Sequence, residues 1–468
     1  MAKHEAPKPA EAALAPERRA ILAHRAVWRW HFYAGLFCIP FVIVLSLTGA
    51  AYLFRPQVEA FLDSPYDHLV LEGAERRPEA QVKAALAAAP EGSRLRFYEV
   101  RREADDAARV ILSTPDGPLI AFVHPESNVV LGLQHEADRP MEVIKTIHGE
   151  LLMGERGSIL VELAAGWAVV MILTGLVLWF PRGGRGAGGV LWPRLGLGGR
   201  LAWRDLHAVT GFWISGLALF LLLTGLPWTT VWNGAFKEIR RATGTLAASQ
   251  EWSSGRKTEQ SDAHAAHRAL SSDGGHKDHA TGTPAPSLDR MAEAAAGLGL
   301  PPPVLIAPPA PGGGWRSSPE WTVRSETPNR PLRAVLTLDP ATGAVRVRET
   351  FGDKHPIDQA IGYGIAAHEG QLFGVANQLL GLVAAVGLIT LSISGVIMWR
   401  RRGPKGVLGA PEALSSVTAA RGVGLAILAL GVFMPVLGVS LVLVALVEFL
   451  VLRRIPGVRT WLGLDPVR

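Results

Sequence analysis

Residues 30–54, WHFYAGLFCIPFVIVLSLTGAAYLF, contain no Asp, Glu, Lys or Arg. A helix needs about 20 apolar residues to cross the hydrocarbon core of a bilayer, and this stretch exceeds that length. Four further stretches lack these four residue types and approach or exceed the same length: 163–180, 206–236, 370–399 and 422–447. The sequence therefore predicts a mainly α-helical membrane protein.

The composition agrees with this interpretation. Of 468 residues, 49% are hydrophobic and only 19% are charged. These values exclude an ordinary soluble domain, a disordered chain and a nucleic-acid-binding protein. The single cysteine, Cys38, lies inside the first apolar stretch. It allows no intramolecular disulfide and no cysteine-based metal site, so other residues must hold any redox cofactor.

Basic residues flank the apolar stretches unevenly, and such a bias sets membrane orientation. Three basic segments are expected on the cytoplasmic side: Lys3, Lys8, Arg18, Arg19, Arg25 and Arg29; Arg182, Arg185, Arg194, Arg200 and Arg204; and Arg400, Arg401, Arg402 and Lys405. The long segments 55–157 and 231–375 then face the other side of the membrane. We expect a multi-pass protein with a cytoplasmic N-terminus.

The expected organisation alternates membrane spans with loops. Four transmembrane helices are predicted at 31–54, 158–180, 207–230 and 376–399. The predicted cytoplasmic parts are 1–30, the basic loop 181–206, the loop 400–417 and the tail 453–468. The remaining apolar stretch, 418–452, is divided by Pro435 and Gly438, so it is either a tight transmembrane hairpin or one kinked helix.

The two long extracytoplasmic segments share one pattern of a helix followed by strands. In 55–157 a helix at 78–89 precedes strands at 95–101 and 109–113 and a hairpin at 118–132. In 231–375 a helix near 287–297 precedes the following predicted strands: VLIAP (304–308), EWTVRS (320–325) and a hairpin at 333–349. We expect two small α+β modules. Residues 243–285, rich in Ser, Gly and His, indicate a flexible insertion.

The chain repeats itself once. Two stretches share a register in which His is followed by Gly after 4 residues and by Thr-Gly after 17 and 18: His31, Gly35, Thr48 and Gly49, and His207, Gly211, Thr224 and Gly225. Two later stretches share offsets of 4, 6, 26, 27 and 31: His148, Leu152, Gly154, Thr174, Gly175 and Trp179, and His368, Leu372, Gly374, Ser394, Gly395 and Trp399. Two units of span, module, histidine and span therefore form a four-helix core.

Helix geometry gives this repeat a chemical meaning. Eighteen residues make about five turns, so His31 and Gly49 share one helix face. A continuous helix from His148 to Trp179 would rise about 46 Å, which places His148 near the outer surface. Each membrane border then has two histidines and two glycines, as a flat macrocycle with two axial imidazoles requires.

The leading hypothesis is two bis-histidine haems. An inner haem is expected on His31 and His207 and an outer one on His148 and His368, with room for the rings at Gly175 and Gly395 inside and at Gly49 and Gly225 outside. The candidate partners of the haem propionates are Arg29, Arg204, Lys145 and Arg156. Any single histidine at a span end is also typical of a plain interfacial residue, and His24 is an alternative to His31.

The quoted motifs resemble the PepSY-associated transmembrane family, the iron-regulated membrane proteins of bacteria. The motifs that carry the resemblance are RWHFYAGLFCIPFVIVLSLTGAAYLF, IHGELLMG, LTGLVLWFPR, RDLHAVTGFWISGLALFLLLTG, AHEGQLFG and SISGVIMWRRR. The resemblance implies PepSY-like extracytoplasmic modules, and electron transfer through two b-type haems on the four repeated histidines. Some members look like haem-containing reductases of ferric siderophores.

We therefore expect an oxidoreductase that passes electrons outward to an extracytoplasmic Fe(III) complex and releases Fe(II). The run GRGAGG at 184–189 lies in a short basic loop without the strand and helix of a dinucleotide site. Since no expected cytoplasmic segment can hold a flavin or nicotinamide domain, the electron donor is a membrane quinol or a separate cytoplasmic reductase. The alternatives are a protein that binds or imports an iron complex without catalysis, and a PepSY-type module that regulates a partner.

A weaker signal lies in the insertion. Four histidines in this tract could capture a metal ion loosely: His264, His267, His276 and His279. The alternative interpretation is a solvated polar linker. Without a fixed geometry, the tract cannot form a catalytic site by itself.

Overall fold

The computed structural model describes residues 16–181, 186–246, 287–309, 320–402, 406–411 and 421–464. The chain divides into two compact units. We call the first the membrane unit (Met1–Ser46, Ile159–Leu222 and Ala384–Arg468) and the second the sheet unit (Leu47–Ser158 and Leu223–Val383). The two units are described separately below.

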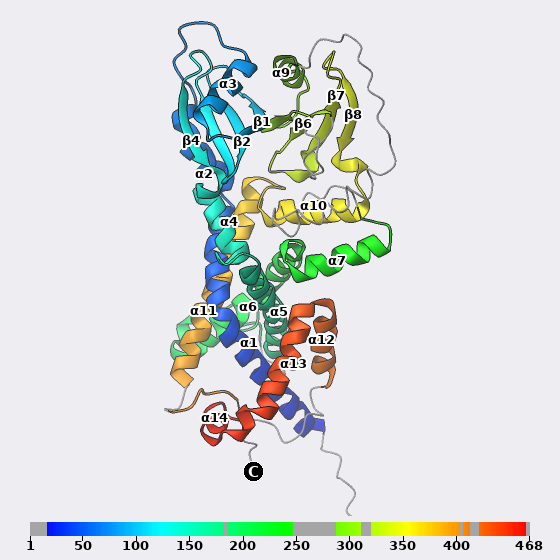
Figure 1. Ribbon diagram of the computed structural model, residues 1–468. Helices are drawn as coiled ribbons and strands as arrows, with labels where there is room; N and C mark the ends of the chain where they lie inside the picture. The colour runs from blue at the N-terminus through cyan, green and yellow to red at the C-terminus, as the bar shows by residue number, and fades with distance from the viewer. Residues whose placement is uncertain are drawn as a thin grey trace, which may run out of the picture. The chain divides into compact units, whose positions relative to one another are not determined.

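Long apolar helices supply most of the membrane unit (Figure 1). The four longest are α1 (Pro16–Tyr52), α5 (Glu155–Trp179), α6 (Gly199–Gly225) and α11 (Val375–Arg402). Among the described residues, five helices are long and apolar enough to cross a membrane: His24–Tyr52, Glu155–Trp179, Gly199–Trp228, Val375–Arg402 and Pro435–Arg454. The expectation of a multi-pass membrane protein is confirmed.

Within the described residues the C-terminal apolar stretch forms two helices, and the number of times that 418–452 crosses the membrane stays a prediction. Helix α12 (Arg421–Phe433) ends before Met434, and α13 (Pro435–Leu450) begins at the proline. A Cβ atom on Gly438 would lie within 2.4 Å of the carbonyl oxygen of Gly431, so the two backbones are in contact. Figure 1 shows α12 and α13 side by side. With 13 residues, α12 rises only about 20 Å, less than the thickness of a bilayer core.

The last described residues are hydrogen-bonded to α1 within the membrane unit. After η8 (Leu452–Arg454) and α14 (Pro456–Trp461), the hydroxyl of Tyr33 donates a hydrogen bond to the carbonyl of Leu462 at 2.5 Å. The guanidinium of Arg29 donates to the carbonyls of Pro411 and Gly463 at 2.6 and 2.8 Å. These bonds satisfy carbonyls that a loop would otherwise leave without partners.

The strands expected in two modules form one antiparallel sheet. Its eight strands are β1 (Arg94–Val100), β2 (Ala108–Thr114), β3 (Gly117–Val123), β4 (Val130–His135), β5 (Val304–Ala307), β6 (Trp321–Ser325), β7 (Ala334–Leu338) and β8 (Val345–Thr350). Their order is β4-β3-β2-β1-β5-β6-β7-β8. Strands β1 and β5 pair through Tyr98↔Ile306, Glu99↔Leu305 and Val100↔Val304. The two predicted α+β modules are therefore joined edge to edge, because each leaves one strand edge that the other can pair.

One helix from each half covers the same face of this sheet (Figure 1). Helices α3 (Pro78–Ala88) and α9 (Leu288–Ala296) pack over a single apolar core that includes Val110, Ile306 and Val323, all fully buried. The two helices also cap each other. The amide of Glu79 donates to Asp289 Oδ1 at 2.9 Å, and the amide of Leu288 donates to Glu79 Oε1 at 2.9 Å. A carboxylate at a helix N-terminus satisfies amides that have no partner inside the helix.

The shorter helices of the sheet unit are α2 (Arg55–Asp63), α4 (Pro140–Glu150), α7 (Val231–Ala242) and α10 (Pro356–His368). Short 3₁₀ turns complete the chain path: η1 (Ser64–Tyr66), η2 (Glu136–Asp138), η3 (Leu195–Leu197), η4 (Leu226–Trp228), η5 (Arg330–Leu332) and η6 (Phe351–Asp353). Of these, η3 belongs to the membrane unit and the others to the sheet unit.

No single helix runs from His148 to Trp179, so the rise calculated for a continuous helix does not apply. Helix α4 ends at Glu150, and Leu151, Leu152 and Gly154 follow with φ of 49°, 58° and 60° before α5 begins. These left-handed backbone angles stop a right-handed helix. The second copy breaks at the same place in the repeat, since Gly374 has a φ of 59° and separates α10 from α11. Each outer histidine is therefore on a short helix of its own.

Candidate haem sites

The structure brings His31 and His207 together inside the membrane unit. His31 projects from α1 and His207 from α6, and their ring centroids lie 6.3 Å apart with an angle of 84° between the ring planes. Two imidazoles 176 positions apart in the sequence thus lie next to each other, with their ring planes nearly perpendicular. The rival residue His24 lies seven residues earlier on α1, about 10 Å along the helix axis.

This separation can be compared with that of two axial haem ligands. An iron–nitrogen bond to imidazole is about 2.0 Å by analogy with other metal–imidazole bonds. A five-membered ring with bonds of about 1.35 Å has its atoms about 1.15 Å from its centre. Two collinear ligands on one iron would therefore have ring centres about 6.3 Å apart. The distance between His31 and His207 fits a bis-histidine haem.

The hydrogen bonds of the inner pair fix the tautomer of each ring. Nδ1 of His31 lies 2.9 Å from the carbonyl oxygen of Met171, and Nδ1 of His207 lies 3.1 Å from the carbonyl oxygen of Leu391. A carbonyl only accepts, so Nδ1 must carry the proton in both rings. The lone pair of each neutral imidazole is then on Nε2, which is the atom a metal requires.

A hydroxyl group joins each of these bonds. Thr174 Oγ1 lies 3.2 Å from Nδ1 of His31, and Ser394 Oγ lies 3.0 Å from Nδ1 of His207. Each hydroxyl donates its own proton to a carbonyl of its helix, at Val170 for Thr174 and at Leu391 for Ser394. The hydroxyl oxygens are therefore acceptors toward the imidazoles, which supports the same tautomer.

The outer histidines repeat this arrangement within the sheet unit. Nδ1 of His148 lies 3.0 Å from Oγ1 of Thr48, and Nδ1 of His368 lies 2.9 Å from Oγ1 of Thr224. The indole of Trp228 packs edge-on against His368, with ring centroids 5.8 Å apart. Each outer imidazole is thus oriented by a hydroxyl from a neighbouring membrane-capable helix.

The four repeated glycines lie against the imidazoles. A Cβ atom would come within 3.0 Å of Cε1 of His31 at Gly175 and within 3.1 Å of Cε1 of His148 at Gly49. The corresponding distances are 3.6 Å at Gly395, toward His207, and 3.5 Å at Gly225, toward His368. In the structure each of these glycines lies beside an imidazole, and the room that they leave for a macrocycle stays a prediction.

Sequence reasoning missed the hydroxyl residues. In all four cases the residue just before the glycine supplies the hydroxyl, as Thr48, Thr174, Thr224 or Ser394. The signal was present, because the repeat keeps a Thr-Gly or Ser-Gly pair at a fixed offset from a histidine. Each pair has two functions: the hydroxyl orients the ring, and the glycine lets it approach.

Three of the four candidate propionate partners have other contacts. Arg29 donates to two carbonyls, as described above, and Arg204 forms an ion pair with the fully buried Asp205. Lys145 forms an ion pair with Glu142, and Arg156 is exposed in the first turn of α5. The structure thus gives no direct support to these four assignments, which stay predictions. The candidate metal ligands His264, His267, His276 and His279 lie outside the described residues.

One buried cation near the outer pair was not predicted. Arg330, in η5, is 7% exposed and lies 3.5 Å from Glu369, the residue after His368. Its guanidinium also lies over the ring of Trp228, 6.0 Å from the centroid. A positive charge so close to His368 had no signal in the sequence, because Arg330 has no counterpart in the repeat that we identified.

The helices and the paired histidines define a multi-pass membrane protein with a separate antiparallel sheet. The sequence pattern described as the PepSY-associated TM region matches residues 28–402. The chain therefore belongs to this family, which confirms the resemblance and suggests a membrane protein of the iron-regulated type. No curated protein matches the chain.

Proposed function

We propose that this chain carries two b-type haems and transfers electrons through them to an extracytoplasmic Fe(III) complex such as a ferric siderophore. The observation that carries the proposal is the inner pair, in which His31 and His207 lie 6.3 Å apart. With Nδ1 of each ring directed at a carbonyl oxygen, both rings keep a lone pair on Nε2 for a metal. The repeated hydroxyls at His148 and His368 support a second, outer site.

The residues of the chain position the ligands and exclude water. The hydrogen bonds at Nδ1 hold each imidazole in one orientation and raise its basicity as a ligand. The apolar helices exclude water from the inner site. Such surroundings favour the uncharged imidazole, which is the form that binds a metal. Bound haem supplies a one-electron couple at each border. Helix α1 carries both His31 and Thr48, separated by 17 residues or about 26 Å of rise.

We place the protein in the bacterial cytoplasmic membrane with its N-terminus inside and the sheet unit outside. A membrane quinol or a separate cytoplasmic reductase supplies the electrons. One electron converts Fe(III) to Fe(II), which binds hard oxygen ligands more weakly, so the complex releases Fe(II) for uptake. The basic segments on one side of the spans support this orientation.

The absorption spectrum of the purified protein tests this proposal. We expect a Soret band, a sharp α-band after reduction and about two haems per chain. Ferric siderophore added to the reduced protein should reoxidise it. A colourless protein from haem-replete cells would instead favour a binding or import protein, or a module that regulates a partner. A haem-containing protein that no Fe(III) complex reoxidises would contradict the proposed substrate.

A further inference from the structure

The face of the sheet opposite α3 and α9 carries two arginines in one row. The register places Arg109 opposite Glu99, Glu99 opposite Leu305 and Leu305 opposite Arg324. Val323, the neighbour of Arg324, belongs to the core under α3 and α9, so the side chain of Arg324 points to the other face. The two arginines thus flank the central strand pair in matching positions.

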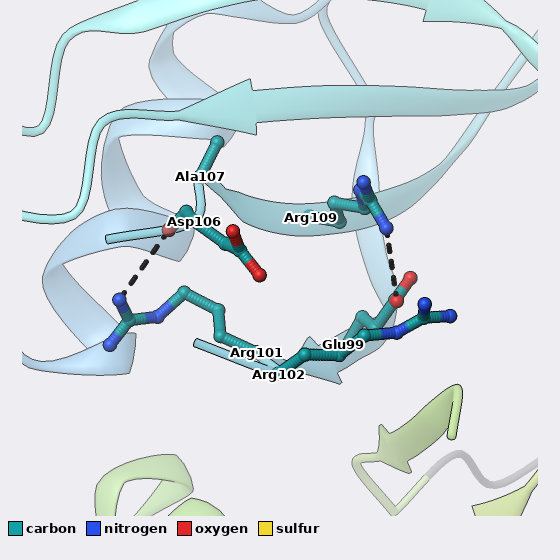
Figure 2. Close-up of a pocket in the computed structure, with 6 residues that line it drawn as sticks. All are labelled: Glu99, Arg101, Arg102, Asp106, Ala107 and Arg109. Atoms are coloured by element: carbon teal, nitrogen blue, oxygen red, sulfur yellow. Dashed lines mark hydrogen bonds and ion pairs between the residues drawn. The ribbon is translucent and has the colours of Figure 1, made fainter. Parts of the chain in front are cut away.

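Arg109 is well compensated by acidic groups. Its guanidinium lies 3.4 Å from Glu99, 3.1 Å from Asp67 and 3.9 Å from Asp63. Figure 2 shows Arg109 directed at Glu99 across the two strands. Burial opposes the charge of Arg109, but the three carboxylates outweigh it and raise the pKa of Arg109. A buried charge of this kind needs no further partner.

Arg324 is equally placed in the row but poorly compensated. The residue is only 9% exposed, and the carboxylate of Glu326 lies 3.9 Å from its guanidinium. Its Nε atom is buried without a hydrogen-bond partner among the residues that the structure describes. The guanidinium lies over the ring of Phe97, 4.4 Å from the centroid. A donor left unsatisfied in this way costs free energy, so an acceptor at this position would bind favourably.

Two more guanidiniums surround Arg324. Arg96 lies over the same Phe97 ring at 5.4 Å, and Arg333 lies 3.2 Å from Glu326, so one carboxylate serves two cations. Burial is the main cause that lowers the pKa of Arg324; Glu326 opposes this shift, and the guanidiniums of Arg96 and Arg333 add to it. We call Arg96, Arg324 and Arg333 the arginine cluster. Its side chains are 25%, 11% and 17% exposed, so solvent reaches the cluster.

The arginine cluster belongs to the same unit as the outer histidines. Arg333 directly follows η5, whose first residue, Arg330, contacts Glu369 and Trp228. Trp228 in turn packs on His368. Helix α10 ends at His368. Within this unit the cluster is therefore connected to His368 through η5 and Trp228.

We propose that the arginine cluster binds an anionic, carboxylate-bearing Fe(III) complex, which is the substrate class of this protein. The inference rests on the proposed function, in which an extracytoplasmic Fe(III) complex accepts the electron. Guanidiniums pair with carboxylates through two parallel hydrogen bonds, which a neutral complex cannot offer. The unsatisfied Nε of Arg324 is the donor that the bound carboxylate engages.

Equilibrium binding of Fe(III)–citrate to the oxidised full-length protein tests the inference, since binding requires no electron transfer. We expect Arg324→Gln to weaken binding by at least about tenfold and Arg324→Lys to weaken it less, because lysine keeps the charge but loses the two-pronged geometry. The matched control is Arg109→Lys, in the same row, which should bind as the wild type does. Rising NaCl should weaken binding, as for any surface-accessible ion pair.

The ligand-free protein provides a second measurement. Because Arg324 is a poorly compensated buried charge, Arg324→Gln should leave the thermal midpoint unchanged or raise it. Unchanged Fe(III)–citrate affinity in Arg324→Gln would overturn the inference, as would equal affinity for a neutral ferric trihydroxamate. The haem spectrum is recorded on the same samples. A protein that lacks haem but binds Fe(III)–citrate through Arg324 would refute the proposed function and keep the anion site.

Discussion

At the residue scale, the ring nitrogen that carries the proton decides whether His31 and His207 can bind a metal through Nε2. A carbonyl oxygen faces Nδ1 of each ring, so the proton stays on Nδ1. The two lone pairs on Nε2 are therefore available without any change of tautomer. Ligands oriented in advance in this way lose little conformational freedom when a metal binds.

Replacing each histidine separately tests the pairing. We expect His31→Ala or His207→Ala to remove the inner haem and leave the outer one, because a single imidazole remains at that site. His148→Ala or His368→Ala should do the reverse. Haem content per chain and the low-temperature α-band distinguish the two cases. The pairing is refuted if one substitution removes both haems or neither, and His24→Ala is the control that should keep both.

We expect the hydroxyls to adjust the reduction potential of the proposed inner haem and not to bind the haem itself. Thr174→Val keeps the shape of the side chain but removes the acceptor 3.2 Å from Nδ1 of His31. We expect both haems to remain and the inner reduction potential to rise, because a less polarised imidazole donates less electron density to the iron. Redox titration measures the shift. The control is Thr390→Val, whose hydroxyl bonds only to the carbonyl of Val386 in the described structure. Equal potentials in the two variants would argue against this role.

At the element scale, the glycines set how closely the helices approach the rings. A Cβ atom at Gly175 would lie 3.0 Å from Cε1 of His31, closer than ordinary van der Waals contact. Gly175→Ala should therefore displace the imidazole and weaken or remove the inner haem, as judged by haem stoichiometry. Gly216→Ala is the matched control on α6, because a Cβ atom there would meet nothing within 4 Å. Full haem content in Gly175→Ala would show that the contact is not restrictive.

A carboxylate stabilises the turn between β7 and β8. Hydrogen bonds from the backbone of Thr342 and from the guanidinium of Arg346 lower the pKa of Asp339 to about 2. An unfolded aspartate titrates near 3.9, so this contribution to stability is present above about pH 4 and is lost as the pH falls toward 2. The protection of this hairpin, measured relative to intrinsic hydrogen exchange, should therefore fall in that range in the wild type. Asp339→Asn should exchange faster at pH 7 and lack the acid transition, and a transition that persists in the variant would implicate another group.

At the scale of the whole molecule, local patterns predicted the elements better than their connections. The strands and the helices α3 and α9 fall within three residues of the predicted ranges, because alternation and turn residues are local signals. The pairing of β1 with β5 joins residues more than 200 positions apart, and nothing local specifies it. Local patterns likewise gave no indication that the helices break after His148 and His368. Leucine rarely adopts a positive φ, so Leu151 and Leu152 gave no signal of a helix end.

The candidate sites show the same division. The repeat placed His31 and His207 at one border from offsets alone, and the structure brings these two rings together. The positive charge of Arg330 near Trp228 could not be predicted. The two residues are about 100 positions apart in the sequence and come together only when η5 packs in the folded protein. Long-range contacts of this kind require the tertiary structure.

Because one sheet and one apolar core join both halves of the sheet unit, we expect the two halves to unfold together. Ile306 of β5 is fully buried in the one core that α3 and α9 share, and its strand pairs with β1 of the other half. Ile306→Ala should cost about 2–5 kcal/mol, as other large-to-small changes in cores do. Hydrogen exchange should then accelerate in β1–β3 as much as in β5–β7, because a shared core opens as one cooperative unit.

The control is Val347→Ala on the edge strand β8, where the side chain is 50% exposed; it should change hydrogen exchange only near that edge. Faster exchange confined to β5–β8 in Ile306→Ala would show two independent modules that merely touch.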